Sequence, residues 1–251
     1  MRTADVIGTR VFAAPLEEVV DELERCLGDE GREYVCFANA HLTSTARRDE
    51  NTARALGNAG FVLADGAPVA WAIRLLTGDA TVRVTGSDVF EELCRRSPTA
   101  GHRHFFLGST PVTLDRMRRS TEERHPGIEI CGSYSPPFGA ALFDELPAIA
   151  RRVNDAQPDI VWVGLGAPRQ EVWMEAARPL LDAPLLLGVG AVFEFVAGTK
   201  RRAPGWMQRS GLEWAHRLLH EPRRLGRRYL VTNTAFSLAL ARQLLGRASG
   251  G

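Results

Sequence analysis

The sequence predicts an α/β fold with a doubly wound, mostly parallel sheet, followed by a basic helical appendage at the C-terminus. Short apolar runs recur along most of the chain, amphipathic stretches separate them, and arginine is concentrated near the end. With 251 residues, of which 45% are hydrophobic and 24% are charged, the chain has the composition of a globular protein with a full core.

The apolar runs are rich in β-branched and aromatic residues, as is typical of strands that are buried on both faces. They lie at residues 34–39, 60–65, 104–108, 128–134, 159–166 and 185–190. Amphipathic stretches at residues 15–27, 87–97 and 143–155 predict helices between them. Because alternating strands and helices build parallel sheets through right-handed crossovers, we expect a Rossmann-like body over residues 1–198.

The chain from Thr199 onward has no strand pattern, and we expect two or three helices there, forming an appendage over residues 199–251. Residues 200–251 carry a net charge of +9 and the preceding 199 residues carry −8, within a total of +1. Tryptophan and leucine alternate with arginine between residues 206 and 229. This pattern is typical of a helix on an anionic lipid surface. An arginine clamp on a diphosphate and a solvated helix docked on the body are the alternatives.

Residues 229–245 form an amphipathic stretch that Arg242 interrupts, so this stretch is suited to lie on a membrane rather than to cross it. No apolar run reaches the ~20 residues that a membrane helix needs, and the N-terminus lacks the apolar region of a signal peptide. The cysteines are Cys26, Cys36, Cys94 and Cys131, and they form no metal-binding spacing with the six histidines. We therefore expect reduced thiols in a cytosolic protein, with no metal and no cofactor.

Small and polar residues follow the predicted strands, and in open α/β sheets ligands bind at the edge where the strands end. These residues are Asn39, His41, Asp65, Gly66, Gly108, Ser109, Thr110, Gly164, Gly166, Gly188 and Gly190. Together they predict one composite site, although Asn and Gly also end strands because they favour turns.

Asp65 directly follows the apolar run 61–64, so we expect it at the tip of a strand above the site. A partly shielded carboxylate at such a place can act as a general base on a hydroxyl. The alternative is that Asp65 is the N-cap of the helix that the following residues predict, because Asp is a favoured capping residue.

Residues 164–171, with the sequence GLGAPRQE, follow an apolar strand and begin a helix. Glycine lets backbone N–H groups approach an anion, and the N-terminus of a helix favours negative charge. The segment matches neither G-x-G-x-x-G nor a P-loop, which argues against a dinucleotide enzyme and an ATPase. Gln170 is suited to bind a sugar or a uracil edge, and a tight turn with solvated Arg169 and Gln170 is the alternative.

Several strings, taken in their order and spacing, resemble the WecG/TagA/CpsF glycosyltransferase family from about Val11 to about Leu244. They are FANAHLTSTARRD (37–49), ADGAPVAWAIRLLTG (64–78), RVTGSDVF (83–90), GLGAPRQEVWM (164–174), LGVGAVFEFVAGTKRRAPGWMQRSGLEW (187–214) and RLLHEPRRLGRRYL (217–230). The resemblance implies a bacterial inverting enzyme with a UDP-linked N-acetylmannosamine-type donor and an acceptor of N-acetylglucosamine on polyprenyl diphosphate. It also implies a role in teichoic acid, common antigen or exopolysaccharide synthesis, a membrane-facing appendage and no metal.

Matching the motifs of this family implies a role for each of several residues. Asp65 falls on the aspartate proposed as the base. The implied substrate-binding residues are Asn39, Arg83, Gly164, Gly166, Gln170, Gly188, Gly190 and Glu194, together with the appendage arginines Arg217, Arg224 and Arg227, which would hold the diphosphate. Two positions depart from the family pattern, because Phe37 stands where threonine is frequent and Glu194 where aspartate is usual.

The expected partners are thus a UDP-sugar donor, a lipid-diphosphate acceptor and an anionic membrane surface at the inner face of the cell membrane, with no nucleic acid. Whether the chain forms a homo-oligomer is left open by the sequence. Two other classes of function remain as alternatives: a nicotinamide-dependent oxidoreductase, and a non-enzymatic module that binds membrane or nucleic acid through its basic tail.

Overall fold

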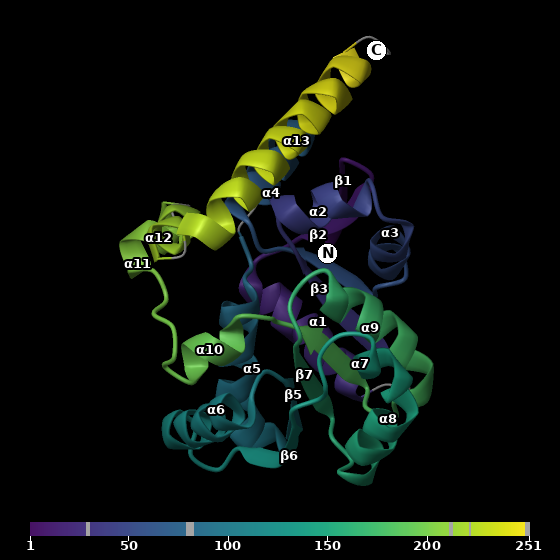
Figure 1. Cartoon of the computed structure of the whole chain (residues 1–251), viewed down its shortest axis with the longest axis vertical. Coiled ribbons are helices and arrows are strands. Elements are labelled where there is room, and N and C mark those ends of the chain that lie inside the picture. The colour runs from purple at the N-terminus through teal and green to yellow at the C-terminus, as the bar shows by residue number, and fades with distance from the viewer. Residues whose placement is uncertain (29–30, 79–82, 211–212, 221, 249–251) are drawn as a thin grey trace.

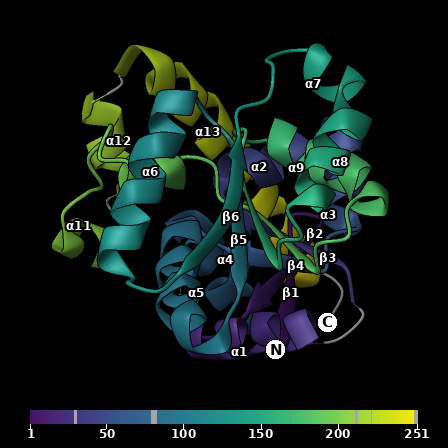
Figure 2. The same cartoon turned by 90° about the horizontal axis from the view of Figure 1, so that it is seen from below.

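The computed structural model describes residues 1–28, 31–78, 83–210, 213–220 and 222–248 (Figure 1). The described strands form an eight-stranded sheet in the order β1-β2-β4-β3-β8-β7-β5-β6. All neighbours pair in parallel except β1 and β2, which are antiparallel. Helices cover both faces of the sheet, with α5 and α6 on one side and α8 and α9 on the other (Figure 2). The predicted α/β class with a mostly parallel sheet is therefore confirmed.

Six strands coincide with the predicted apolar runs, and the first two form a hairpin that the sequence did not predict. The strands are β1 (Arg2–Val6), β2 (Thr9–Ala13), β3 (Glu33–Ala38), β4 (Phe61–Ala64), β5 (Arg103–Gly108), β6 (Glu129–Tyr134), β7 (Ile160–Gly164) and β8 (Leu185–Gly188). Ile7 and Gly8 connect the hairpin, with φ values of 49° and 89°. Positive φ at both central residues suits the tight turn between twisted antiparallel strands. The hairpin was missed because its strands are short and alternate with charged residues.

The helices of the body confirm two predicted ranges and divide the third. They are α1 (Leu16–Gly28), α2 (Ala40–Ala46), α3 (Glu50–Gly57), α4 (Ala67–Thr77), α5 (Gly86–Ala100), α6 (Pro111–Arg124), α7 (Ala141–Asp144), α8 (Leu146–Asp155), α9 (Arg169–Ala177), the 3-10 turn η1 (Arg178–Leu180) and α10 (Val192–Val196). The predicted helix over residues 143–155 overlaps α7 and coincides largely with α8. Pro147 lies in the first turn of α8, where its missing N–H costs no helical hydrogen bond.

Two hydrophobic cores lie on opposite faces of the sheet. Successive residues of β3 alternate between them, with Tyr34 and Cys36 in one core and Val35 and Phe37 in the other. The first core also contains side chains from α2, α4, α8, α9 and α13, and the second contains side chains from α1, α5, α6 and α10. Burial on both faces explains why the strands are continuously apolar in the sequence.

The chain after α10 contains α11 (Gly205–Arg209), α12 (Glu213–His220) and α13 (Pro222–Ala248), and no strand among its described residues. The second half of α13 packs beside α2, and Phe236 and Ala239 are buried in the core. Gln243 accepts a hydrogen bond from Ile7 N at 2.8 Å and donates one to Asp5 O at 2.8 Å. The body thus occupies one face of the stretch that we expected to lie on a membrane. Among the described side chains of this stretch, the large apolar ones that are exposed are Val231, Leu238 and Leu245.

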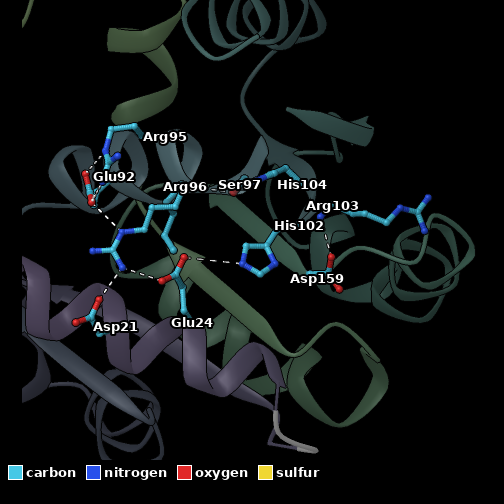
Figure 3. Close-up of polar contacts among 11 residues, drawn as sticks. Asp21, Glu24, Glu92, Arg95, Arg96, Ser97, His102, Arg103, His104 and Asp159 are labelled. Atoms are coloured by element: carbon cyan, nitrogen blue, oxygen red, sulfur yellow. Dashed lines mark hydrogen bonds and ion pairs between the residues drawn. The ribbon is translucent and has the colours of Figure 1, made fainter. Parts of the chain in front are cut away.

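Charged side chains of α1 and α5 form ion pairs with one another (Figure 3). Arg96 Nη1 lies 2.6 Å from Asp21 Oδ1 and 2.7 Å from Glu24 Oε2. Arg103, at the start of β5, donates a hydrogen bond from its backbone N–H to Asp159 Oδ2 at 2.7 Å. None of these residues lines the cavity at the carboxyl ends of the strands.

His104 is fully buried and is held as a neutral ring between two partners. Trp162 Nε1 donates to His104 Nδ1 at 2.9 Å, and His104 Nε2 lies 2.8 Å from Ser97 Oγ (Figure 3). Because the Ser97 hydroxyl donates to Leu93 O, His104 Nε2 must carry the proton. Burial lowers the pKa of His104 to about 3.

We expect this histidine to make the fold sensitive to acid. Between pH 6.5 and about 3 the unfolded chain protonates at His104 and the folded chain does not, so stability falls as the pH falls, by up to about 1.4 kcal/mol per pH unit. Urea unfolding at pH 7, 6, 5 and 4 measures this slope. The His104→Phe variant is expected to be less stable at pH 7, because Trp162 Nε1 loses its acceptor, and to show a shallower slope. Equal slopes in the two proteins would contradict the prediction.

Candidate active site

A cavity of about 1120 Å³ lies at the carboxyl ends of β3, β4, β7 and β8, with residues of α12 and α13 also in its wall. Nine of the twelve predicted site residues line it: Asn39, Asp65, Arg83, Gly164, Gly166, Gln170, Gly188, Gly190 and Glu194. Phe37, which differs from the family pattern, also lines the cavity. The three remaining predictions are Arg217 on α12 and Arg224 and Arg227 on α13, and their side chains lie outside the described residues. Motifs spread over more than 150 residues of sequence therefore meet at one edge of the sheet.

Asn39 directly follows β3 and Asp65 directly follows β4, and these neighbouring strands end at the same register position. Ala38 of β3 and Ala64 of β4 are register partners, and Asp65 N donates to Ala38 O at 3.0 Å. A Cβ on Gly66 would lie 3.0 Å from the Cβ of Asn39, so a larger residue at position 66 would crowd the end of β3. The site thus places a carboxylate beside a carboxamide at the wall of the cavity.

The N-cap of α4 is Gly66 and not Asp65. The capping alternative that the sequence left open for Asp65 is therefore wrong. Asn39 does cap a helix, because its Oδ1 accepts from Leu42 N at 3.0 Å at the start of α2. The amide nitrogen of Asn39 makes no hydrogen bond to any residue that the structure describes.

Gln170 connects the loop after β7 to the end of β8. Its Nε2 donates to Gly188 O at 2.6 Å and to Glu171 Oε1 at 2.9 Å, and its Oε1 accepts from Gly166 N at 3.2 Å. The side chain is only 4% exposed. In this structure the amide is engaged by the protein itself, which favours a positioning role over the direct sugar or uracil contact suggested by the sequence.

Glu171 is a functional candidate that sequence reasoning missed. It is completely buried, and its Oε2 has no hydrogen-bond partner among the described residues. Burial raises the pKa of Glu171 to about 7, and the hydrogen bond from Gln170 opposes this rise. The string PRQE contained the residue, but a glutamate in the first turn of a helix ordinarily indicates a favourable dipole interaction at the surface.

Three glycines of the strand ends lie against atoms that would have to shift to admit a Cβ. A Cβ on Gly108 would lie 2.5 Å from Gly164 O, one on Gly164 would lie 2.7 Å from the ring of Phe193, and one on Gly188 would lie 2.6 Å from Met174 Cε. Gly166 and Gly190 instead have positive φ values of 82° and 56°, which glycine adopts without strain. The predicted glycines thus shape the wall of the cavity.

Arg83 precedes α5 and forms an ion pair with Glu213, the first residue of α12, with Nη1 and Oε2 3.1 Å apart. Glu194 lies in α10, and its carbonyl accepts hydrogen bonds from Thr199 N and Lys200 N. Glu213 is a further residue that sequence reasoning missed, because its partner is 130 positions away in the chain. The cavity therefore combines acidic, basic and amide groups from body and appendage.

Part of the cavity wall is apolar and open to solvent. Exposed residues that also line the cavity are Trp71, Leu75, Phe138 and Trp214. None of the described helices is both long enough and apolar enough to span a membrane. Within the described part of the chain there is no group of three or more His, Cys, Asp or Glu side chains that could hold a metal ion.

Comparison with known proteins gives a match along almost the whole chain. The family model described as "Glycosyl transferase WecG/TagA/CpsF family" matches residues 4–250. An N-acetylglucosaminyldiphosphoundecaprenol N-acetyl-beta-D-mannosaminyltransferase of Bacillus subtilis (strain 168) is 28% identical over 239 residues, covering 95% of this chain and 91% of the relative. The protein of the same name from Staphylococcus aureus (strain MW2) is 24% identical over 247 residues, covering 97% and 95%.

Proposed function

We propose that this chain, which belongs to the WecG/TagA/CpsF family of glycosyl transferases, moves an N-acetylmannosamine-type sugar from a UDP donor to N-acetylglucosamine on a polyprenyl diphosphate. The chain is a glycosyltransferase, which confirms the family resemblance and sets aside the oxidoreductase and the non-enzymatic module. The observation that carries the proposal for the site is that nine residues from five separate family strings line one cavity. The names of the relatives support the sugar and the lipid-linked acceptor.

In the proposed reaction Asp65 is the general base. The acceptor hydroxyl gives its proton to the Asp65 carboxylate, its oxygen forms a bond to the anomeric carbon, and the bond from that carbon to UDP breaks. Attack opposite the leaving group inverts the configuration at this carbon. Asp65 suits the role because it stands at a strand tip in the cavity wall, within reach of a bound ligand.

The departing UDP takes up negative charge on its diphosphate, and this charge needs positive partners. Arg83 and Lys200 line the cavity. Helix α9 begins at Arg169, directly after the cavity-lining loop that contains Gly166. Guanidinium groups bind diphosphate through paired hydrogen bonds, and preorganised donors lower the energy of the developing charge. We also assign Arg217, Arg224 and Arg227 to this task, on the basis of the family motif.

The lipid part of the acceptor is proposed to leave the cavity along its apolar wall. Trp71 and Leu75 of α4 and Trp214 of α12 are exposed and line the cavity together. We propose that residues 1–198 bind the donor, that residues 199–251 complete the acceptor side, and that the enzyme works at the inner face of the cell membrane, at an anionic surface. The lipid-linked acceptor and the net charge of +9 in residues 200–251 support the roles proposed for the appendage and for the membrane surface.

A donor screen tests the proposal. The full chain is incubated with short-chain polyprenyl-diphosphate N-acetylglucosamine and each of several UDP-hexoses, and products are identified by mass spectrometry. We expect a disaccharide-lipid with UDP-N-acetylmannosamine. Product only with another UDP-sugar would overturn the assigned donor, and no product with any donor, from a folded protein, would overturn the proposed reaction.

A further inference from the structure

The ion pair between Arg83 and Glu213 lies where the appendage meets the body at the cavity. The side chains of Arg83 and Glu213 are 19% and 12% exposed, and both residues line the cavity. A largely shielded pair of this kind costs more to break than a surface pair, because breaking it leaves a charge without its partner in a partly desolvated site. The pair therefore ties the position of α12 to the position of the Arg83 guanidinium.

The geometry of Arg83 leaves it able to bind a second anion. Its hydrogen bond to Glu213 uses Nη1, which is one position on a guanidinium that carries five N–H groups. A guanidinium that is held by one carboxylate has fewer accessible rotamers, so the loss of rotamer freedom on binding a diphosphate is reduced. Glu213 thus prepares Arg83 for a ligand as well as balancing its charge.

The segment around Arg83 receives a second contact from the chain after α10. Arg202 Nη2 donates to Asp88 Oδ1 at 2.9 Å and to Thr85 Oγ1 at 3.2 Å, at the N-terminus of α5. On the other side of α12, α13 is anchored to the body through Ser44 Oγ, which donates to Thr232 O at 3.2 Å. Helix α12 consequently lies, along the chain, between two segments that are anchored to the body. Figure 1 shows α11 and α12 at the side of the molecule away from β1 and β2.

We infer that Glu213 is a positioning residue: it holds Arg83 for the diphosphate of a substrate, so that diphosphate binding depends on the docking of α12. This inference rests on the proposed function. Because coupling between two binding events is reciprocal, a bound diphosphate must in turn stabilise the docked state of α12. The diphosphate could belong to the nucleotide donor or to the lipid acceptor, and the experiment distinguishes them.

The first test is the Glu213→Ala variant of the full chain, which removes the acceptor of the Arg83 hydrogen bond. We expect KM to rise by about 10–100-fold for the substrate whose diphosphate Arg83 binds, since a hydrogen bond to a charged group contributes about 1.5–3 kcal/mol, whereas kcat changes by only a few-fold. A rise in the KM of the UDP-sugar assigns the donor, and a rise in the KM of the lipid-linked substrate assigns the acceptor. Unchanged KM values for both substrates would overturn the inference.

Hydrogen exchange of residues 213–220 provides a readout that does not depend on turnover. We expect UDP or inorganic pyrophosphate to slow exchange in the wild type and to have little effect in Glu213→Ala. If the wild type transfers no sugar but pyrophosphate still protects α12 through Arg83 and Glu213, the proposed reaction fails and the inference stands. Absence of protection in an active wild type would overturn the inference and leave the reaction intact.

Two further variants separate positioning from simple tethering. The double variant Arg83→Glu with Glu213→Arg restores an ion pair, so we expect hydrogen exchange of α12 to be slow again. We do not expect the low KM to return, because the cation is then on α12 at position 213 and no longer at position 83. Full recovery of KM in this variant would show that the pair only tethers the helix. Glu175→Gln is the matched control, since it breaks the 2.9 Å pair of Arg54 and Glu175, which does not line the cavity, and should leave both readouts unchanged.

Discussion

Replacing Asp65 with asparagine is expected to lower kcat by about 10²–10⁴-fold, the range that a positioned general base contributes. Asparagine has nearly the same shape as aspartate but cannot accept the proton of the acceptor hydroxyl. The Asp65 backbone N–H bond to Ala38 O does not involve the side chain, so the strand end should keep its geometry. Steady-state turnover with UDP-N-acetylmannosamine measures the effect, and calorimetric titration with UDP shows whether donor binding is retained.

Asp49→Asn is a matched control for this prediction. Asp49 caps α3 through a hydrogen bond from Thr52 N at 2.8 Å and does not line the cavity. Asparagine is a comparable capping residue, so this variant should keep both its stability and its turnover. If Asp65→Asn turned over within a few-fold of the wild type, the proton would have another acceptor and the assignment of the base would fail.

The architecture could be predicted from the sequence because each strand's burial is visible in its own few residues. Strands covered on both faces must be apolar at every position, so runs such as residues 159–166 are visible without knowledge of their neighbours. The location of the site was equally accessible, since the ends of parallel strands meet at one edge. The hairpin of β1 and β2 was missed because one of its strands pairs only with the other, and edge strands tolerate charged residues.

The roles of Glu213 and Glu171 could not be predicted, because they depend on partners that are distant in sequence or on complete burial. Nothing near Glu213 in the sequence indicates Arg83, which lies 130 positions earlier. The sequence places Glu171 in the first turn of a helix, where an exposed glutamate is common, and only packing shows that its carboxylate is enclosed. Gln170 illustrates the same limit: its residue type suggested a ligand contact, and the structure shows partners within the protein.

Replacing Gln170 with alanine should destabilise the fold by about 2–6 kcal/mol at pH 8, because the carbonyl of Gly188 and the carboxylate of Glu171 would each lose a buried donor, at about 1–3 kcal/mol per group. The loop after β7 would also lose its connection to β8. Urea unfolding followed by tryptophan fluorescence measures the loss. A variant of unchanged stability with a much higher KM for the donor would instead support direct contact between Gln170 and the ligand.

The pH dependence of this effect has a definite sign. The pKa of Glu171 is about 7 in the folded chain and near 4.5 in the unfolded chain, so its contribution to stability is complete below about pH 4.5 and is lost as the pH rises through 7. The donor Gln170 limits that loss by stabilising the ionised form. Replacing Gln170 should therefore lower the free energy of unfolding more at pH 8 than at pH 5.

Glu171→Gln still offers an oxygen to Gln170 Nε2 without a charge to bury, so it should be at least as stable as the wild type at pH 8 and largely lack this pH dependence. Equal losses at the two pH values for Gln170→Ala would show that the amide does not govern the ionisation of Glu171.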